Sequence, residues 1–215
     1  MMKKAFLFAL AAFCVSAVQA VTVGWTSHGT VEQGDSIAIN GSATGFSVAL
    51  VFDLTTVSSF SSMEAYLSVM SNTLCYSLGA DAKLQHNPIR VGMNYSGNLP
   101  TTDNSPWKTN TTASVIKNGQ NVVGLIFYTE NGNQYIDCYV NGTLLNPGSM
   151  WTGSIPYNVT FDEIIIGNET NMSNIELYTM NGKATADDFA SVPEPTALAL
   201  LALGVASLAL KRKVA

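Results

Sequence analysis

Alternating apolar and polar residues dominate the middle of this 215-residue chain. Period-two runs rich in β-branched and aromatic residues predict strands whose successive side chains point to opposite faces of a sheet. These runs cover residues 36–40, 46–54, 73–78, 89–95, 122–129, 134–140, 163–166 and 174–180. The pattern therefore predicts an all-β chain.

Turn signals punctuate the same region. Asn-Gly readily supplies the positive φ angles of type I′ hairpin turns. This dipeptide begins at Asn40, Asn118, Asn131, Asn141 and Asn181. The polar stretch at 101–112 predicts an exposed loop.

One stretch departs from the strand pattern. Phe60, Met63, Leu67 and Met70 lie at offsets 0, 3, 7 and 10, which is the spacing of one helical face. We therefore expect a short helix over residues 60–70.

The last 24 residues have an order of their own. Pro193, Glu194 and Pro195 precede an uncharged apolar run at 197–210 and a Lys-Arg-Lys cluster at 211–213. As a helix at about 1.5 Å per residue, this run would span about 21 Å, less than a hydrocarbon core of about 30 Å. This order resembles the PEP-CTERM sorting tail of Gram-negative bacteria. The resemblance implies recognition by an exosortase, removal of the tail, and delivery to the cell surface or extracellular matrix.

A plain C-terminal transmembrane helix after a proline-rich stalk is the alternative for the tail. The N-terminus independently predicts export. A basic segment at 1–4, with Lys3 and Lys4, precedes an apolar run at 5–18, and Val-Gln-Ala at 18–20 suits signal-peptide cleavage. We expect a signal peptide at 1–20, one domain at 21–192 and a sorting tail at 193–215. The tail would contact the membrane through its short hydrophobic helix before processing.

The charge of the expected mature domain excludes some partners. It carries five basic residues against 14 acidic ones, a net charge of −9. Nucleic acid and anionic lipid are therefore poor partners.

Two cysteines remain in the expected domain. Cys75 alternates with polar neighbours, whereas Cys138 alternates with aliphatic ones, so period-two logic lets them face differently. A disulfide requires Cα atoms about 4.4–6.8 Å apart. Both a disulfide and two free thiols remain open.

Several motifs of the middle resemble the concanavalin A-like, laminin-G type jelly roll in their order. Residues 46–52 are similar to its early core strand, and 122–145 to its central hairpin. Within that hairpin, Tyr-Val-Asn-Gly-Thr-Leu at 139–144 matches a "Y-V-D-G-x-L" pattern, with Asn141 in place of Asp. Residues 164–167 match the late strand, and 175–189 the closing strand and its turn. The resemblance implies a jelly-roll β-sandwich of lectin-like type.

The sequence shows no recognisable set of catalytic residues. A glycosidase needs two carboxylates on one face, and the pattern E-x-D-x-x-E is absent. Asp162 and Glu163 are adjacent, so in a regular strand they point to opposite faces. His28 and His86 lack metal-ligand spacing. We expect that the protein is not an enzyme.

Sugar binding would use an aromatic ring beside amides and carboxylates. Trp107, Trp151 and Tyr157 lie in polar, turn-rich stretches, and Asp103 and Asn104 precede the first of them closely. Rings that plug the ends of the sandwich are the structural alternative.

Calcium is a further candidate ligand, because this fold class often carries it. Oxygen ligands are available from Asp103, Asn104, Asp137 and Asn141, but no spacing among them fixes a site.

The sequence thus predicts an exported, exosortase-sorted surface or matrix protein with a non-catalytic glycan-binding or adhesive β-sandwich. Its expected partners are the secretion machinery, an exosortase, and a glycan or exopolysaccharide. A purely structural matrix component without a small ligand is the alternative. A glycoside hydrolase or lyase ranks third.

Overall fold

The computed structural model describes residues 24–55, 63–72, 74–81, 89–94, 107–110, 116–145, 159–167 and 172–192. Within these ranges the chain forms twelve strands and one short helix. The strands make two six-stranded antiparallel sheets, named sheet A and sheet B below. The prediction of an all-β jelly-roll sandwich is confirmed.

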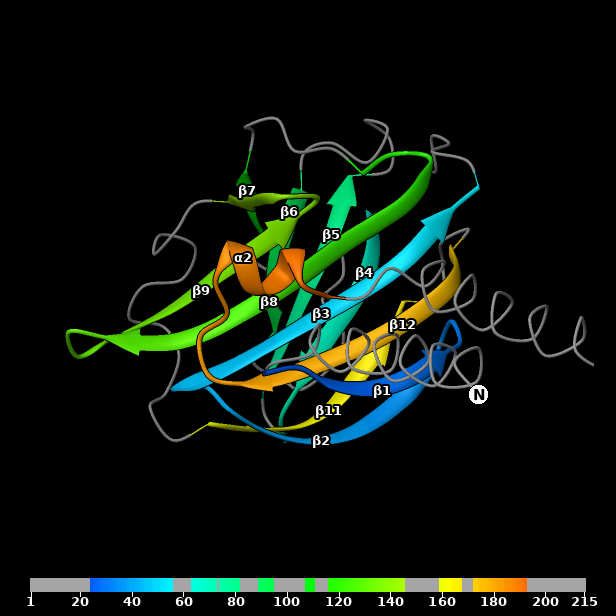
Figure 1. Cartoon of the computed structure of the whole chain (residues 1–215). Coiled ribbons are helices and arrows are strands. Elements are labelled where there is room, and N and C mark those ends of the chain that lie inside the picture. The colour runs from blue at the N-terminus through cyan, green and yellow to red at the C-terminus, as the bar shows by residue number, and fades with distance from the viewer. Residues whose placement is uncertain are drawn as a thin grey trace, which may run out of the picture.

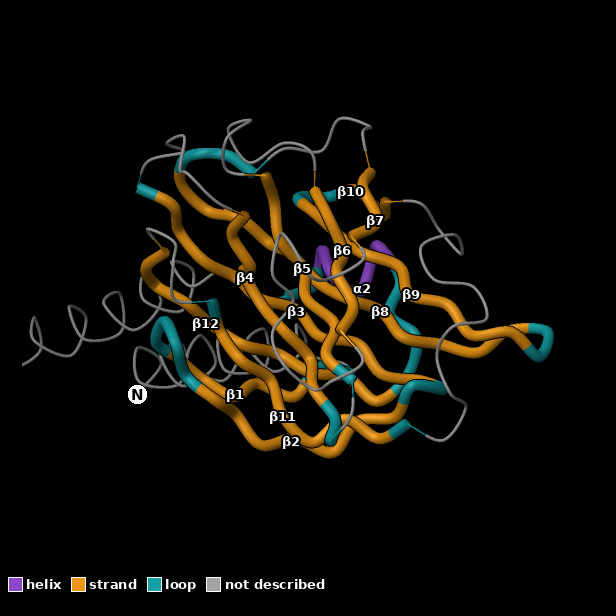
Figure 2. Tube along the Cα trace, turned by 180° about the vertical axis from the view of Figure 1, so that it is seen from behind, coloured by secondary structure: helices purple, strands orange, loops and turns teal. Residues whose placement is uncertain are grey.

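The two sheets interleave elements from all parts of the chain. Sheet A contains, in spatial order, β1 (Thr26–Val31), β12 (Met172–Asn181), β3 (Gly45–Leu54), β8 (Gly119–Glu130), β9 (Asn133–Val140) and β10 (Thr143–Leu145). Sheet B contains β2 (Ser36–Ser42), β11 (Thr160–Ile166), β4 (Met63–Met70), β5 (Cys75–Asp81), β6 (Ile89–Asn94) and β7 (Trp107–Asn110). Figure 1 shows β12, β3 and β8 in front of β4 and β5, and Figure 2 shows the same layers from behind.

The main core lies between the two sheets. Phe127 of sheet A and Phe161 of sheet B have ring centroids 4.5 Å apart. Phe52 stacks on Tyr66 across the same space at 5.2 Å. Full burial of a large apolar side chain stabilises the folded state by about 1.5–3 kcal/mol. These aromatic contacts therefore help to hold the two sheets together.

A second apolar cluster covers the outer face of sheet A. Helix α2 (Ala186–Ala190) lies on this face, over β8 and β9 in Figure 1. It buries Phe189 against Tyr139, and Ile126 and Tyr178 are buried in the same cluster. Sheet A is therefore apolar on both faces at its centre.

Turn chemistry fixes two of the hairpin connections. Asn131-Gly132 joins β8 to β9 with φ angles of 51° and 77°, and Asn141-Gly142 joins β9 to β10 with 45° and 90°. Both pairs confirm the type I′ expectation. Asn40-Gly41 instead lies within β2, where a Cβ on Gly41 would come 2.9 Å from the ring of Phe46. This glycine makes room for a core side chain and forms no turn.

The helix expected at 60–70 is wrong wherever the structure describes it. Residues 63–70 form β4, which pairs with β5 on one side and β11 on the other. Leu67, for example, lies opposite both Leu78 and Ile166. Hydrogen bonding along both edges and burial of both faces outweigh a weak helical spacing.

Two edge strands were not predicted. The stretch at 101–112 contains β7 at Trp107–Asn110, which pairs with β6. Near the N-terminus, β1 pairs with β12 although its residues are mostly polar and exposed. Edge strands have only one neighbour, so their sequences carry a weaker alternation.

No helix among the described residues is long and apolar enough to cross a membrane. The expected signal peptide at 1–20 and the tail at 193–215 lie outside the described residues. The domain boundaries therefore stay predictions.

Candidate functional site

A group of aromatic and charged side chains lies on the outer face of sheet A, beside the β8–β9 hairpin. It contains Tyr128, Tyr135, Asp137, Glu130 and Lys183, and we call it the tyrosine platform. Tyr128 and Glu130 belong to β8, and Tyr135 and Asp137 belong to β9. Each pair is two residues apart, so both of its side chains point to the same face of the sheet. Lys183 lies two residues after the end of β12.

Two stacked rings form the base of the platform. Tyr128 and Tyr135 are direct cross-strand partners, with ring centroids 5.1 Å apart and planes inclined by 21°. Tyr128 is 4% exposed, whereas Tyr135 is only half-buried. The outer ring is thus supported from below and keeps part of its surface in solvent.

A buried carboxylate fixes the inner ring. The Tyr128 hydroxyl donates to Oδ2 of Asp137 at 3.0 Å, and Asp137 is 1% exposed. Burial, followed by the negative charge of Asp137, raises the pKa of Tyr128 well above its ordinary value. The phenol therefore stays a neutral hydrogen-bond donor.

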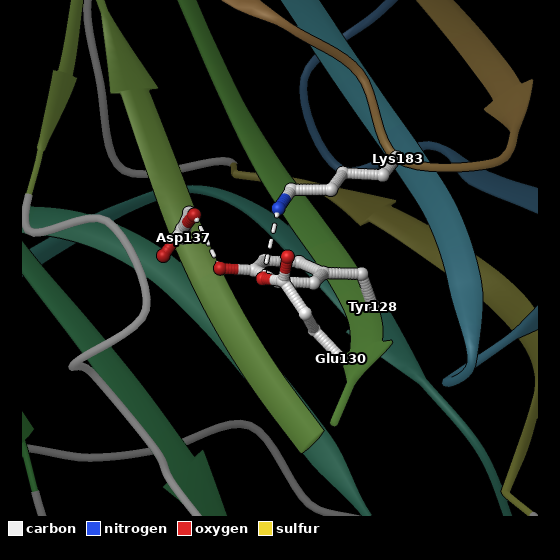
Figure 3. A network of polar contacts seen from close by, with 4 residues as sticks. All are labelled: Tyr128, Glu130, Asp137 and Lys183. Carbon is white, nitrogen blue, oxygen red and sulfur yellow. Dashed lines mark hydrogen bonds and ion pairs between the residues drawn. The ribbon is translucent and has the colours of Figure 1, made fainter. Parts of the chain in front are cut away.

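A lysine lies over the inner ring. Nζ of Lys183 lies 3.6 Å from the Tyr128 ring centroid and 3.5 Å from Oε2 of Glu130 (Figure 3). The side chains of Lys183 and Glu130 are 44% and 58% exposed, so the ion pair adds about 0–1 kcal/mol at most. Its ammonium and carboxylate remain accessible to a ligand.

The backbone on either side of Lys183 is held by one serine. The hydroxyl of Ser47 donates to the carbonyl of Gly182 at 2.8 Å and accepts from the amide of Ala184 at 2.9 Å. Ser47 is fully buried in β3. Through these two bonds, strand β3 fixes the backbone that carries Lys183 over the Tyr128 ring.

Each carboxylate of the platform has a partner within the protein. Asp137 accepts the tyrosine hydroxyl, and Glu130 forms an exposed ion pair with Lys183. Among the residues that the structure describes, no group of three His, Cys, Asp or Glu side chains could hold a metal ion.

Of the five residues that the sequence proposed for sugar binding, Trp107 alone lies in the described part of the chain. The backbone of Trp107 lies in β7, opposite Gly92 of β6, in a register row that continues to Ser77 and Ser68 of sheet B. Asp103, Asn104, Trp151 and Tyr157 lie outside the described residues, as do Pro193, Glu194 and Pro195. Their proposed roles stay predictions.

The platform residues were missed, although one signal pointed to them. Tyr128 and Tyr135 lie three positions on either side of the Asn131-Gly132 turn. A two-residue turn at that place makes them cross-strand partners, and the alternation puts both on the same face. The contribution of Lys183 had no local signal, because it comes from a different part of the chain.

The two cysteines are free thiols, and both are buried. Cys138 lies in the core between the sheets, whereas Cys75 alternates with the core residues Tyr76 and Leu78 and thus lies on the outer face of sheet B. The predicted difference in facing explains why no disulfide joins them. Burial raises the pKa of Cys75 to about 11 and that of Cys138 to about 12, so both are unreactive at neutral pH.

Two of the calcium candidates, Asn141 and Asp137, make hydrogen bonds within the protein. Oδ1 of Asn141 accepts from the amide of Val122, and its Nδ2 donates to Oδ1 of buried Asn121, both at 2.9 Å. An aspartate at 141 could not make the second bond. This explains the asparagine in the "Y-V-D-G-x-L" pattern. Asp137 accepts from Tyr128, as described above.

Comparison with known proteins identifies the tail. Residues 191–213 match the model of the PEP-CTERM protein-sorting motif. The motif indicates an exported protein that an exosortase sorts to the cell surface of a Gram-negative bacterium. No curated protein matches the chain in sequence.

Similar solved structures include lectin and enzyme domains. The Caenorhabditis elegans galectin LEC-6 has a TM-score of 0.46 at 12% identity and covers 74% of this chain and 96% of its own. Trypanosoma rangeli sialidase scores 0.47 at 13% identity, covering 80% of this chain and 32% of its own. Domain 4 of the Geobacillus stearothermophilus arabinanase AbnA, in complex with arabinotriose, scores 0.42 at 14% identity, covering 78% and 80%.

Proposed function

We propose that this exported surface protein is a non-catalytic glycan-binding module of the envelope or its exopolysaccharide, and that the tyrosine platform is its binding site. The observation that carries the proposal is the partly exposed ring of Tyr135, stacked on Tyr128, with Lys183 over Tyr128 and Glu130 paired to that lysine. We further propose that the sandwich is of the laminin-G type.

The chemistry of the platform fits a sugar. The apolar face of a pyranose packs on an aromatic ring, and its hydroxyls both donate and accept hydrogen bonds. Lys183, which lies over Tyr128, can donate to a hydroxyl, and Glu130 beside it can accept from one. The rigid support of Ser47 and the stacked tyrosines reduces the entropy lost on binding.

A glycan array probed with the exported protein tests the proposal. Tyr135→Ala should weaken binding about tenfold, because it removes a stacking contact of about 1.5 kcal/mol. Tyr135→Phe is the matched control, since it keeps the ring and should retain binding. Lys183→Ala should reduce affinity less, because its side chain is half-exposed.

The competing functions give different results in the same experiment. Binding that is lost in Trp107→Ala or Trp151→Ala, but kept in Tyr135→Ala, would move the site away from the platform. Binding that is lost only on chelation would indicate calcium. Silence of the folded protein across the array would favour a purely structural matrix component. Release of new reducing ends from a bound glycan would contradict the non-catalytic proposal.

A further inference from the structure

The residues just before the sorting tail belong to the folded domain. Helix α2 and Val192 pack on the outer face of sheet A against Trp25, Gly124 and Tyr139. We call this group the C-terminal clasp. It brings the beginning of the described chain next to its end.

Phe189 is the centre of the clasp. Its ring stacks on Tyr139 at 4.2 Å with an interplanar angle of 10°, and Trp25 packs against it edge-on at 5.1 Å. Below it, a Cβ on Gly124 would come 2.3 Å from Cε1 of Phe189. The glycine therefore leaves the space that the phenylalanine fills.

Hydrogen bonds hold both ends of α2. Thr185 and Asp188 form a capping box at its start. The indole N–H of Trp25 donates to the carbonyl of Asp188 at 2.9 Å, which ties the helix to the N-terminal segment. The amide of Val192 donates to the carbonyl of Phe189 at 3.2 Å, and Val192 is 6% exposed.

The matched sorting motif overlaps this folded segment. It begins at Ser191, which is the C-cap of α2, and its second residue is the buried Val192. Pro193 follows without a spacer. Three extended residues reach at most about 10 Å, so Pro195 stays within about 10 Å of Val192. An enzyme that binds the motif must therefore approach the clasp closely.

We propose that the clasp gates processing: the enzyme that removes the tail binds the motif only after α2 and Val192 leave the outer face of sheet A. Enzymes that cut a peptide chain commonly bind it in extended form on both sides of the bond, as in strand addition. Residues 186–190 form a capped helix, and Phe189 and Val192 are buried in the clasp, so this segment cannot adopt that form while docked. The apparent affinity for the enzyme then falls in proportion to the undocked fraction.

This proposal rests on the exosortase processing that the tail motif indicates, and not on glycan binding. The experiment follows tail removal from the full chain by pulse-chase in a host that supplies the enzyme. Six Gly/Ser residues followed by a second Ser-Val pair, inserted between Val192 and Pro193, keep the matched motif whole and separate it from the clasp, which stays undisturbed. We expect tail removal at least about threefold faster. The same insertion between Asn131 and Gly132, at a distant hairpin, is the matched control and should change nothing.

Two substitutions test the gate without changing chain length. Trp25→Phe removes the bond to the Asp188 carbonyl but keeps a ring, and Val192→Ser weakens the last buried contact. Both leave the inter-sheet core intact, and both should accelerate tail removal, by less than the spacer does. An unchanged or slower rate with the spacer would overturn the proposal, because it would mean that the enzyme accepts or requires the docked clasp. Loss of glycan binding in these variants has no bearing on it.

Discussion

The two outer faces of the sandwich are buried by different chemistry. On sheet A, Ile126, Tyr139 and Phe189 form an apolar cluster beneath helix α2. On sheet B, Ser68 and Ser77 are buried as a hydrogen-bonded pair with Cys75 beside them. The cover of sheet A is supplied by the segment that leads into the sorting tail. A change on that face should therefore affect both stability and processing, whereas a change on sheet B should affect stability alone.

Removal of the helix anchor should have the largest effect. Phe189→Ala deletes a fully buried ring that contacts Tyr139 and Trp25, and we expect a loss of about 3 kcal/mol in the free energy of unfolding. Denaturant unfolding measures it. Asp187→Ala, on the exposed side of the same helix, is the control and should cost about 0.5 kcal/mol or less. A loss below about 1 kcal/mol for Phe189→Ala would mean that α2 is not a structural cover.

A side chain at Gly124, beneath Phe189, should cause the next largest loss of stability. A Cβ at position 124 would meet Cε1 of Phe189 at 2.3 Å and the carbonyl oxygen of Val48 at 2.4 Å. Gly124→Ala should therefore cost about 2 kcal/mol. In a Phe189→Ala background the first clash is gone and the second remains, so the cost should fall by about 1 kcal/mol. Strict additivity in this double-mutant cycle would show that the two positions are not coupled.

The platform tyrosine predicts a pH dependence. Burial and Asp137 raise the pKa of Tyr128 in the folded state above about 10, the value expected in the unfolded chain. The neutral phenol is thus favoured by folding. The stability that the neutral phenol gives to the folded state is complete below about pH 10, and it is lost as the pH rises toward the folded pKa.

Tyr128→Phe tests this contribution. At pH 7 it should cost about 1.5 kcal/mol, because a hydrogen bond to a buried carboxylate is lost. The difference between the two proteins should narrow as the pH is raised above 10. Unfolding curves collected from pH 7 to pH 11 measure it. A constant difference over this range would contradict the assignment.

Much of the fold was predictable because both sheets follow the alternation of strands. The run at 46–54 and the hairpin at 122–140 matched β3, β8 and β9, since central strands pair on both sides and keep a strong pattern. The opposite facing of Cys75 and Cys138 also followed from period two. Strand β4 was missed, because its apolar residues fit a helical spacing as well as a strand.

The platform and the clasp depended on contacts that are distant in sequence. Lys183 reaches Tyr128 through the pairing of β12 with β3 and of β3 with β8, and no local pattern encodes three neighbouring strands. The role of Gly124 is likewise invisible until Phe189 is placed over it. Thr185 and Asp188 lie in the predicted closing turn, where they form the capping box of a helix that positions the end of the domain.

The smallest expected effect concerns the polar face of sheet B. The hydroxyls of Ser68 and Ser77 lie 2.5 Å apart, and both side chains are buried. Ser77→Ala leaves one buried hydroxyl without this partner, which should cost about 1 kcal/mol. The double variant with Ser68→Ala removes both hydroxyls and should cost less than the sum of the single changes, because no unpaired group remains. Denaturant unfolding measures the cycle, and tail removal should be unaffected in all three variants. If tail removal changed as much as in the clasp variants, the two faces would not be separate in function.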